Sequence, residues 1–228
     1  MSTPLKLFFS FAILIASSMK KEALLENSDS ATKKSLLKAA KEEFLEKGYQ
    51  EASLRSICKK AGVTTGALYF FFKGKEALFE SLVAGVSQDL VSMLQEHFAF
   101  EREFIKSGKP KKGDGQDMGD DLFAGKKIFS YMYSHYDQIT LLLKKSKGSV
   151  YENFTDKLVA ITEKQNSLAT APLGKQVTHW VSHMQINSFV HIFTHVKSEK
   201  QALEMLPYVM EYLKDGFYGM VGLKEKNR

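Results

Sequence analysis

The sequence predicts an all-α protein of two helical domains, and three observations support that prediction. Apolar residues recur every three or four positions along most of the chain, which is the period of an amphipathic helix. Only at Phe129, Tyr131 and Tyr133 do aromatic residues alternate as in a strand, and this stretch has no second one to pair with and fits a helix equally well. Four prolines and 15 glycines in 228 residues leave most positions free to be helical.

The composition excludes several classes of protein. Apolar residues make up 44% and charged residues 25% of the chain, so it is not collagen-like, of low complexity or wholly disordered. The single cysteine, Cys58, excludes an internal disulfide and a cysteine-based zinc site. The formal net charge of +6 suits an anionic partner, but it does not choose between a nucleic acid and a membrane.

Residues 1–30 are predicted to be an extension outside the folded domains. Residues 7–16 (LFFSFAILIA) follow Lys6 and precede small residues, as in a signal peptide. They are too few to cross a bilayer as a helix, which takes about 20 residues. Three interpretations stay open: a targeting segment, an arm that packs or stays loose, and upstream sequence joined to a protein that starts at Met19. We favour the start at Met19, because MKKEALL resembles an ordinary cytoplasmic opening.

Capping and breaking residues bound the elements that follow. A helix from Thr32 to Gly48 precedes two short helices, one capped by Ser53 and one over residues 66–72. A long helix is predicted over residues 75–106, and a polar, glycine-rich loop follows over residues 107–120. The remaining helices are predicted around residues 128–133 and over residues 136–145, 150–168, 175–196 and 200–221, with Pro207 either kinking the last helix or lying in its first turns.

Residues 53–75 (SLRSICKKAGVTTGALYFFFKGK) predict a helix-turn-helix, which is two short helices joined by a tight glycine turn. Gly62 allows the positive φ of that turn, and apolar residues of both helices face inward. A helix that presents outward side chains from its N-terminal half suits the major groove of DNA, where base edges are distinguishable. The outward residues of the second helix are Thr65, Gly66, Ala67, Tyr69 and Phe70.

The charge of the same region supports contact with DNA. Between Ala31 and Leu78, ten Lys and Arg residues stand against five Glu residues, which gives this fifth of the chain a net charge of +5. Lys and Arg side chains near phosphates release counterions and supply affinity that does not depend on base sequence. For Lys33, Lys34 and Lys41, a solvated basic face is the alternative interpretation.

Three motifs occur within residues 32–83: AA-x-x-x-F followed by Gly48-Tyr49, SLRSI followed by AGV, and GALY-x-x-F-x-x-KEAL. Together they resemble the N-terminal domain of TetR-family transcriptional regulators. The resemblance covers roughly a quarter of the chain. It implies a DNA-binding domain followed by a helical domain that holds a small molecule and pairs with a second copy through its last two helices.

The resemblance also implies roles for matching positions of the first helix and the turn. Ser53 would cap that helix near the phosphate backbone, and Arg55 would contact DNA from it. Thr64 and Thr65 would bond phosphate or base edges. Many members have Lys or Arg at the position of Thr65, whose shorter side chain reaches fewer atoms.

Matching positions in the second helix and beyond it complete the implied interface. Gly66 and Ala67 would lie against the bases, and Tyr69 would give its hydroxyl to a phosphate. Lys75 would hold another phosphate together with the N-terminal amides of the long helix. Phe71 stands where many members have a histidine, and a phenylalanine cannot make a polar contact with DNA.

The C-terminal half is predicted to form a dimer and to bind a ligand. Between residues 177 and 196 apolar side chains cover nearly every direction around the helix, which indicates burial by the core on one side and by a partner subunit on the other. A large monomeric core is the alternative. The candidate pocket residues are Phe98, Tyr131, Tyr133, Trp180, His183 and Met184.

Two histidine pairs at i, i+4 spacing, His179/His183 and His191/His195, could each chelate a metal. The pairs centre about 120° apart around the helix, so they cannot share one ion. We therefore expect no metal, and no cofactor other than an unknown small-molecule effector.

These observations divide the chain into an extension (1–30), a helix-turn-helix domain (31–78) and a ligand-binding and dimerisation domain (79–228). They predict a cytoplasmic homodimer that binds a near-palindromic operator in double-stranded DNA, a repressor released by a small molecule, with no membrane partner. No nucleophile–base pair or glycine-rich phosphate loop supports an enzyme. If residues 7–16 are a genuine targeting segment, the alternative is a membrane-tethered or exported helical binding protein. Arg55→Ala and Lys75→Ala are expected to weaken DNA binding with little loss of stability.

Overall fold

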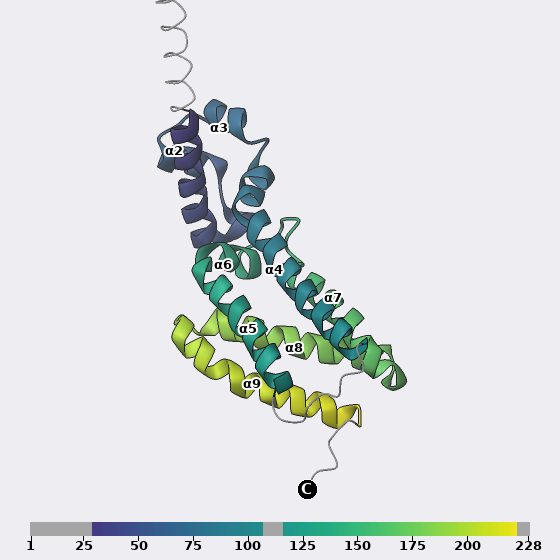
Figure 1. Ribbon diagram of the computed structural model, residues 1–228. Coiled ribbons are helices and arrows are strands. Elements are labelled where there is room, and N and C mark those ends of the chain that lie inside the picture. Colours follow the sequence, from purple (N-terminus) through teal and green to yellow (C-terminus); the bar gives the residue numbers. More distant parts are fainter. Residues whose placement is uncertain (1–28, 107–115, 223–228) are drawn as a thin grey trace, which may run out of the picture.

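The computed structural model describes residues 29–106 and 116–222, and in them every regular element is a helix (Figure 1). The all-α prediction is therefore confirmed for these residues. Most of the predicted N-terminal extension, with residues 7–16 and Met19, lies outside them. The helices, in chain order, are a first helix over residues 29–51, α2 Leu54–Ala61, α3 Thr65–Phe71, α4 Lys75–Lys106, α5 Gln116–Ser134, α6 Tyr136–Lys144, α7 Phe154–Thr170, the short 3-10 helix η1 Ala171–Leu173, α8 Lys175–His195 and α9 Glu199–Met220.

The first helix, α2 and α3 form a small domain at one end of an elongated molecule (Figure 1). The side chain of Ser53 caps α2 by accepting from the backbone N–H of Ser56, and Gly62 ends α2 with a φ of 68°. Such a left-handed conformation favours glycine, because a Cβ would be strained there. Thr64 then caps α3 by accepting from the N–H of Ala67. The two caps and the glycine turn are all local features of the sequence, and together they set the bounds of α2 and α3.

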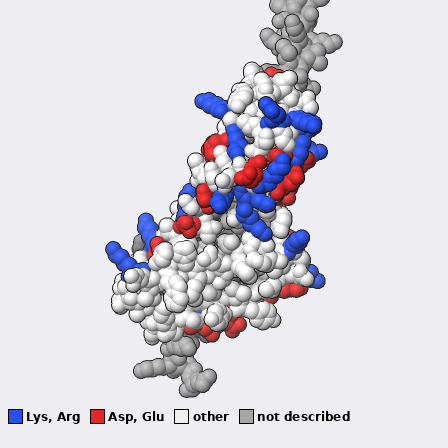
Figure 2. Space-filling model, turned by 180° about the vertical axis from the view of Figure 1, so that it is seen from behind, with Lys and Arg blue, Asp and Glu red and all other residues white. Residues whose placement is uncertain are grey.

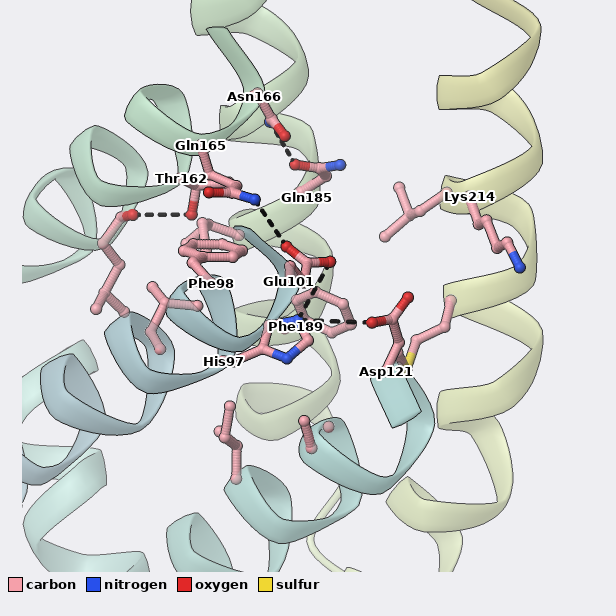
Figure 3. A pocket seen from close by; sticks show the side chains of 18 of the residues that line it. His97, Phe98, Glu101, Asp121, Thr162, Gln165, Asn166, Gln185, Phe189 and Lys214 are labelled. Atoms are coloured by element: carbon pink, nitrogen blue, oxygen red, sulfur yellow. Dashed lines mark hydrogen bonds and ion pairs between the residues drawn. The ribbon is translucent and has the colours of Figure 1, made fainter. Parts of the chain in front are cut away.

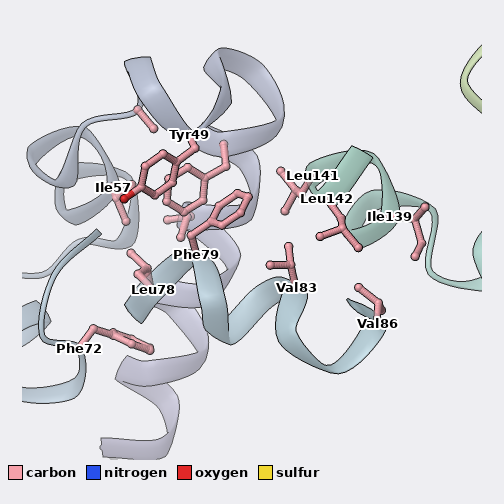
Figure 4. Close-up of a cluster of buried hydrophobic side chains, with 14 of the residues drawn as sticks. Tyr49, Ile57, Phe72, Leu78, Phe79, Val83, Val86, Ile139, Leu141 and Leu142 are labelled. Atoms are coloured by element: carbon pink, nitrogen blue, oxygen red, sulfur yellow. The ribbon is translucent and has the colours of Figure 1, made fainter. Parts of the chain in front are cut away.

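Helix α4 leaves this domain and runs the length of the molecule (Figure 1). Among the described residues, it is the helix long and apolar enough by composition to cross a membrane. Its apolar side chains nevertheless face the protein core, since Leu78, Phe79 and Val83 are wholly buried. Figure 4 shows them between the first helix and the α6 residues Leu141 and Leu142. One core cluster therefore joins the N-terminal domain to the C-terminal domain.

The C-terminal domain is a bundle in which α7 packs along α8, and α5 packs along α9. A second, smaller core lies between α5, α8 and α9 (Phe129, Ile192, Ala202 and Leu206). Helices α4 and α7 close the other side. Their packing leaves a cavity in the middle of the bundle.

Two helices begin at other residues than predicted, and the structure also gives the position of Pro207. Helix α5 begins at Gln116, so residues 116–120 of the predicted loop are helical, and the rest of that loop lies outside the described residues. Helix α7 begins at Phe154 rather than at residue 150, because Ser146 and Ser149 form hydrogen-bonded turns before it. Pro207 lies inside α9, two turns beyond its first residue.

Candidate nucleic-acid interface and ligand cavity

Helix α3 presents the outward face that the sequence predicts. Leu68 is buried and anchors the helix, whereas Tyr69 and Phe70 are 59% and 73% exposed. Thr65 and Gly66 are also exposed, and Ala67 is half-buried. The face carries a phenol, a hydroxyl and apolar groups, which suits contact with phosphates, base edges and thymine methyl groups.

Helix α2 and the turn place further predicted residues at the surface. Arg55 and Ser53 are exposed on α2, and Thr64 is exposed at the start of α3. The Thr64 hydroxyl accepts from the Ala67 N–H at 3.2 Å, so it holds the end of α3 in shape. Its oxygen is therefore a structural cap as well as a candidate DNA contact.

Lys75 differs most from its predicted role. Its Nζ donates to the carbonyl oxygens of Gln50 at 3.0 Å and of Ala52 at 3.3 Å, and it lies 4.7 Å from the centroid of the Tyr49 ring. The ammonium thus closes the end of the first helix, where carbonyl groups lack helical partners. These contacts argue against the expectation that Lys75→Ala leaves stability almost unchanged, because the variant would uncover these carbonyls.

A buried carboxylate, which the sequence analysis missed, joins the first helix to α2. Glu43 is fully buried, and its oxygens accept from Lys47 Nζ at 2.8 Å and from Ser56 Oγ at 2.9 Å, with Lys60 Nζ also 2.8 Å away. Burial alone would raise the pKa of Glu43, but these hydrogen bonds outweigh it and lower the pKa from 4.5 to about 2. The i, i+4 spacing of Glu43 and Lys47 was the available clue in the sequence.

Figure 2 shows that charged side chains, with Lys and Arg interspersed with Asp and Glu, gather over the N-terminal domain on the face drawn, while the larger domain is mostly uncharged there. The basic residues of the domain that are exposed include Lys33, Lys34, Lys38, Lys59 and Lys73. This distribution follows the +5 count of the sequence and places positive charge around the helix-turn-helix.

Polar contacts connect this domain to the rest of the chain. The Tyr49 N–H donates to the carbonyl of Lys145 at 2.8 Å, and the Tyr49 hydroxyl donates to Glu76 at 2.6 Å. Burial and the Glu76 carboxylate together raise the pKa of Tyr49 to about 12, so the phenol keeps its proton. Lys41 and Asp137 form an ion pair of 2.7 Å between the first helix and α6.

The cavity in the C-terminal domain has a volume of about 560 Å³ and lies among α4, α5, α7, α8 and α9 (Figure 3). This volume falls in the range of small-molecule sites. Apolar side chains such as Leu90, Ile128 and Phe189 form most of its wall. The polar groups labelled in Figure 3 are His97, Glu101, Asp121, Thr162, Gln165, Asn166, Gln185 and Lys214.

Of the six residues predicted for the pocket, the structure brings Phe98 to the cavity wall. The other five lie elsewhere, so the prediction is corrected for them. Tyr131 donates its hydroxyl to Asp89, and Tyr133 donates to the Val196 carbonyl. Trp180, His183 and Met184 lie on the outer side of α8, with Trp180 68% exposed. The sequence could not separate inner from outer aromatic residues, because helical spacing alone does not say which neighbour each face meets.

The comparisons with known proteins agree with this geometry over the N-terminal domain. The family described as bacterial regulatory proteins, tetR family, matches residues 36–82. Those residues are similar to a TetR-family domain, and they are called the TetR domain below. An uncharacterized HTH-type transcriptional regulator of Bacillus subtilis, YdgC, is 44% identical over 52 residues, which is 23% of this chain and 27% of the relative. The regulator UidR of Escherichia coli is 40% identical over 52 residues, 23% of this chain and 26% of its own length.

These matches span about a quarter of the length of the relatives, so the sequence likeness is confined to the TetR domain. The fold likeness extends further. The crystal structure of a transcriptional regulator from Aquifex aeolicus VF5 aligns with 80% of this chain and 99% of its own, at a TM-score of 0.52 and 19% identity. The helical C-terminal domain therefore follows the same fold.

Proposed function

We propose that this protein is a transcriptional regulator that binds operator DNA as a homodimer and is released from it by a small molecule. The main supporting observation is the exposed face of α3 in a domain that matches the TetR family and carries a net positive charge. Phosphate contacts from the basic residues would position the domain, and the α3 face would read bases in the major groove.

The dimer is supported by apolar side chains that the single chain leaves uncovered on its last two helices. Trp180 and Met184 are exposed on α8, and Tyr208 and Tyr212 are each 75% exposed on α9. Within each helix the two residues are four apart, so they share a face. Large apolar side chains exposed together in this way are typical of protein interfaces. A twofold pair would place two copies of α3 about 34–36 Å apart, as successive major grooves require.

The cavity supports the release step. It lies against α4, and α4 begins only four residues after α3 ends. A ligand that fits the cavity better in one orientation of α4 than in another would shift the protein toward that orientation and change the separation of the two α3 helices.

The decisive experiment selects fragments of the source genome bound by the purified full-length protein and measures their affinity. Arg55→Ala should weaken binding by about tenfold or more, because it removes a cation from α2 beside the groove. Lys126→Ala removes the same charge from an exposed position on α5 and serves as the matched control. Failure of the wild type to select any fragment, or full affinity in Arg55→Ala, would overturn the proposal. A screen for compounds that release the bound fragment then tests the effector.

A further inference from the structure

Three side chains with metal-ligating atoms converge at one side of the cavity. His97 and Glu101 lie one turn apart on α4, and Asp121 faces them from α5 (Figure 3). His97 Nε2 lies 3.8 Å from Glu101 Oε1 and 3.7 Å from Asp121 Oδ1, and the ligand atoms of all three residues lie within 4.8 Å of one another. All three side chains are half-buried.

Hydrogen bonds from neighbouring polar residues orient the Glu101 carboxylate of this cluster. Gln165 on α7 donates its Nε2 to Glu101 Oε2 at 2.9 Å, while Arg102 donates to Gln165 Oε1 at 2.9 Å. The Glu101 carboxylate is thereby fixed through one oxygen, and its other oxygen is the one near His97. Held ligands of this kind, with a second layer of hydrogen bonds, are typical of metal sites.

We propose that His97, Glu101 and Asp121 bind a divalent metal ion of the first transition row. Bonds of about 2.1 Å to an ion place neighbouring ligand atoms about 3.0–3.4 Å apart, so small side-chain rotations bring these three atoms into place. One imidazole and two carboxylates suit Mn²⁺ or Zn²⁺. Three protein ligands leave at least one coordination position for a water or for an oxygen atom of a ligand in the cavity.

The ion has a mechanical consequence, because it bonds α4 to α5. Helix α5 packs along α9, which belongs to the proposed dimer face, and α4 carries the TetR domain at its other end. The bound ion therefore fixes the orientation of α4 against the dimer scaffold. This deepens the proposed function by naming the ion as a component of the effector site.

The test measures metal binding without DNA. The full-length protein is titrated with Mn²⁺ alone and with Zn²⁺ alone by calorimetry, and its Tm is followed at each ratio. We expect binding of one ion per chain and a rise in Tm, because a ligand of the folded state stabilises it. Glu101→Gln and Asp121→Asn should each weaken the affinity by about tenfold or more, and Gln165→Ala should weaken it by roughly tenfold through loss of the second layer.

His179→Ala is the matched control. His179 contacts Glu163 in another histidine–carboxylate pair, outside the cavity and 60% exposed. It should keep the wild-type affinity. Wild-type affinity in both Glu101→Gln and Asp121→Asn, or no binding of either ion by a protein shown to be folded by circular dichroism, would overturn the inference. Selection of genomic fragments in the absence of metal would still succeed, so the two proposals fail separately.

Discussion

At the start of α4, the Lys75 side chain stabilises the backbone of the N-terminal domain that carries the candidate nucleic-acid interface. Its ammonium satisfies two carbonyl groups at the end of the first helix and lies over the Tyr49 ring. A lysine at the edge of a DNA-binding domain invites a phosphate contact, but the geometry here gives it a partner within the chain.

Replacing Lys75 by alanine should therefore lower both stability and DNA affinity. Loss of two hydrogen bonds from a charged donor should cost about 2 kcal/mol of unfolding free energy, measured by urea denaturation. Lys73→Ala, which removes an exposed neighbouring lysine, should leave stability within roughly 0.5 kcal/mol of the wild type. Equal stability of the two variants would show that the Lys75 contacts contribute nothing.

Glu43 should govern the acid limit of the N-terminal domain. Its pKa in the folded protein is about 2, below the ordinary value of 4.5, so its contribution to stability is complete above pH 4.5 and disappears as pH falls from there towards 2. Glu43→Gln should cost about 3 kcal/mol at neutral pH, because it removes the buried carboxylate whose hydrogen bonds from Lys47, Lys60 and Ser56 lower its pKa. It should also flatten the pH dependence of stability in that window.

The exposed neighbour Glu42 provides the control for the Glu43 variant. Glu42→Gln should leave the stability at neutral pH within about 0.5 kcal/mol of the wild type, and both variants are measured by chemical denaturation at each pH. A Glu43→Gln protein that follows the same acid profile as Glu42→Gln would contradict the assignment.

Among the helices, two glycines with different surroundings separate intrinsic propensity from packing. Gly85 is exposed in the middle of α4, and a Cβ there would meet no atom within 4 Å. A Cβ on Gly125 of α5 would lie 3.1 Å from the Met210 sulfur and 3.3 Å from Leu206 Cδ2 of α9.

Gly85→Ala should therefore raise stability by about 0.8 kcal/mol, the usual gain in a helix interior. Gly125→Ala gains the same propensity but must displace Met210, so it should be neutral or destabilising, and it should shrink the cavity beside it. Thermal unfolding of the two variants side by side checks this, and an equal gain in both would contradict the close packing of α5 on α9.

At the scale of the helices, features that depend only on residues close together in the sequence could be predicted. The caps at Ser53 and Thr64 and the glycine turn at Gly62 are such local features, so α2 and α3 form close to their predicted positions. The cavity wall depends on which helices meet. Tyr131 and Tyr133 lie two positions apart on α5, so they point towards different neighbours, α4 and the end of α8. His97 and Glu101 were visible as an i, i+4 pair, but Asp121 joins them only through packing.

For the whole molecule, the exposed face of α8 and α9 predicts self-association. Tyr212→Lys should place like charges against each other across a twofold axis and convert the dimer to monomers, followed by sedimentation velocity, with loss of operator binding. Val150→Lys changes an equally exposed apolar residue between α6 and α7 and should leave the dimer intact. A dimeric Tyr212→Lys protein would place the twofold contact elsewhere.

The hydrogen bond from the Tyr49 backbone to the Lys145 carbonyl ties the TetR domain to the end of α6 through main-chain atoms. Apart from proline at position 49, which has no N–H, no substitution removes either hydrogen-bonding group, so changes in the cavity wall leave this bond in place. In the proposed release step we therefore expect the N-terminal domain and the end of α6 to move together, because this bond and the Lys41–Asp137 ion pair both join them.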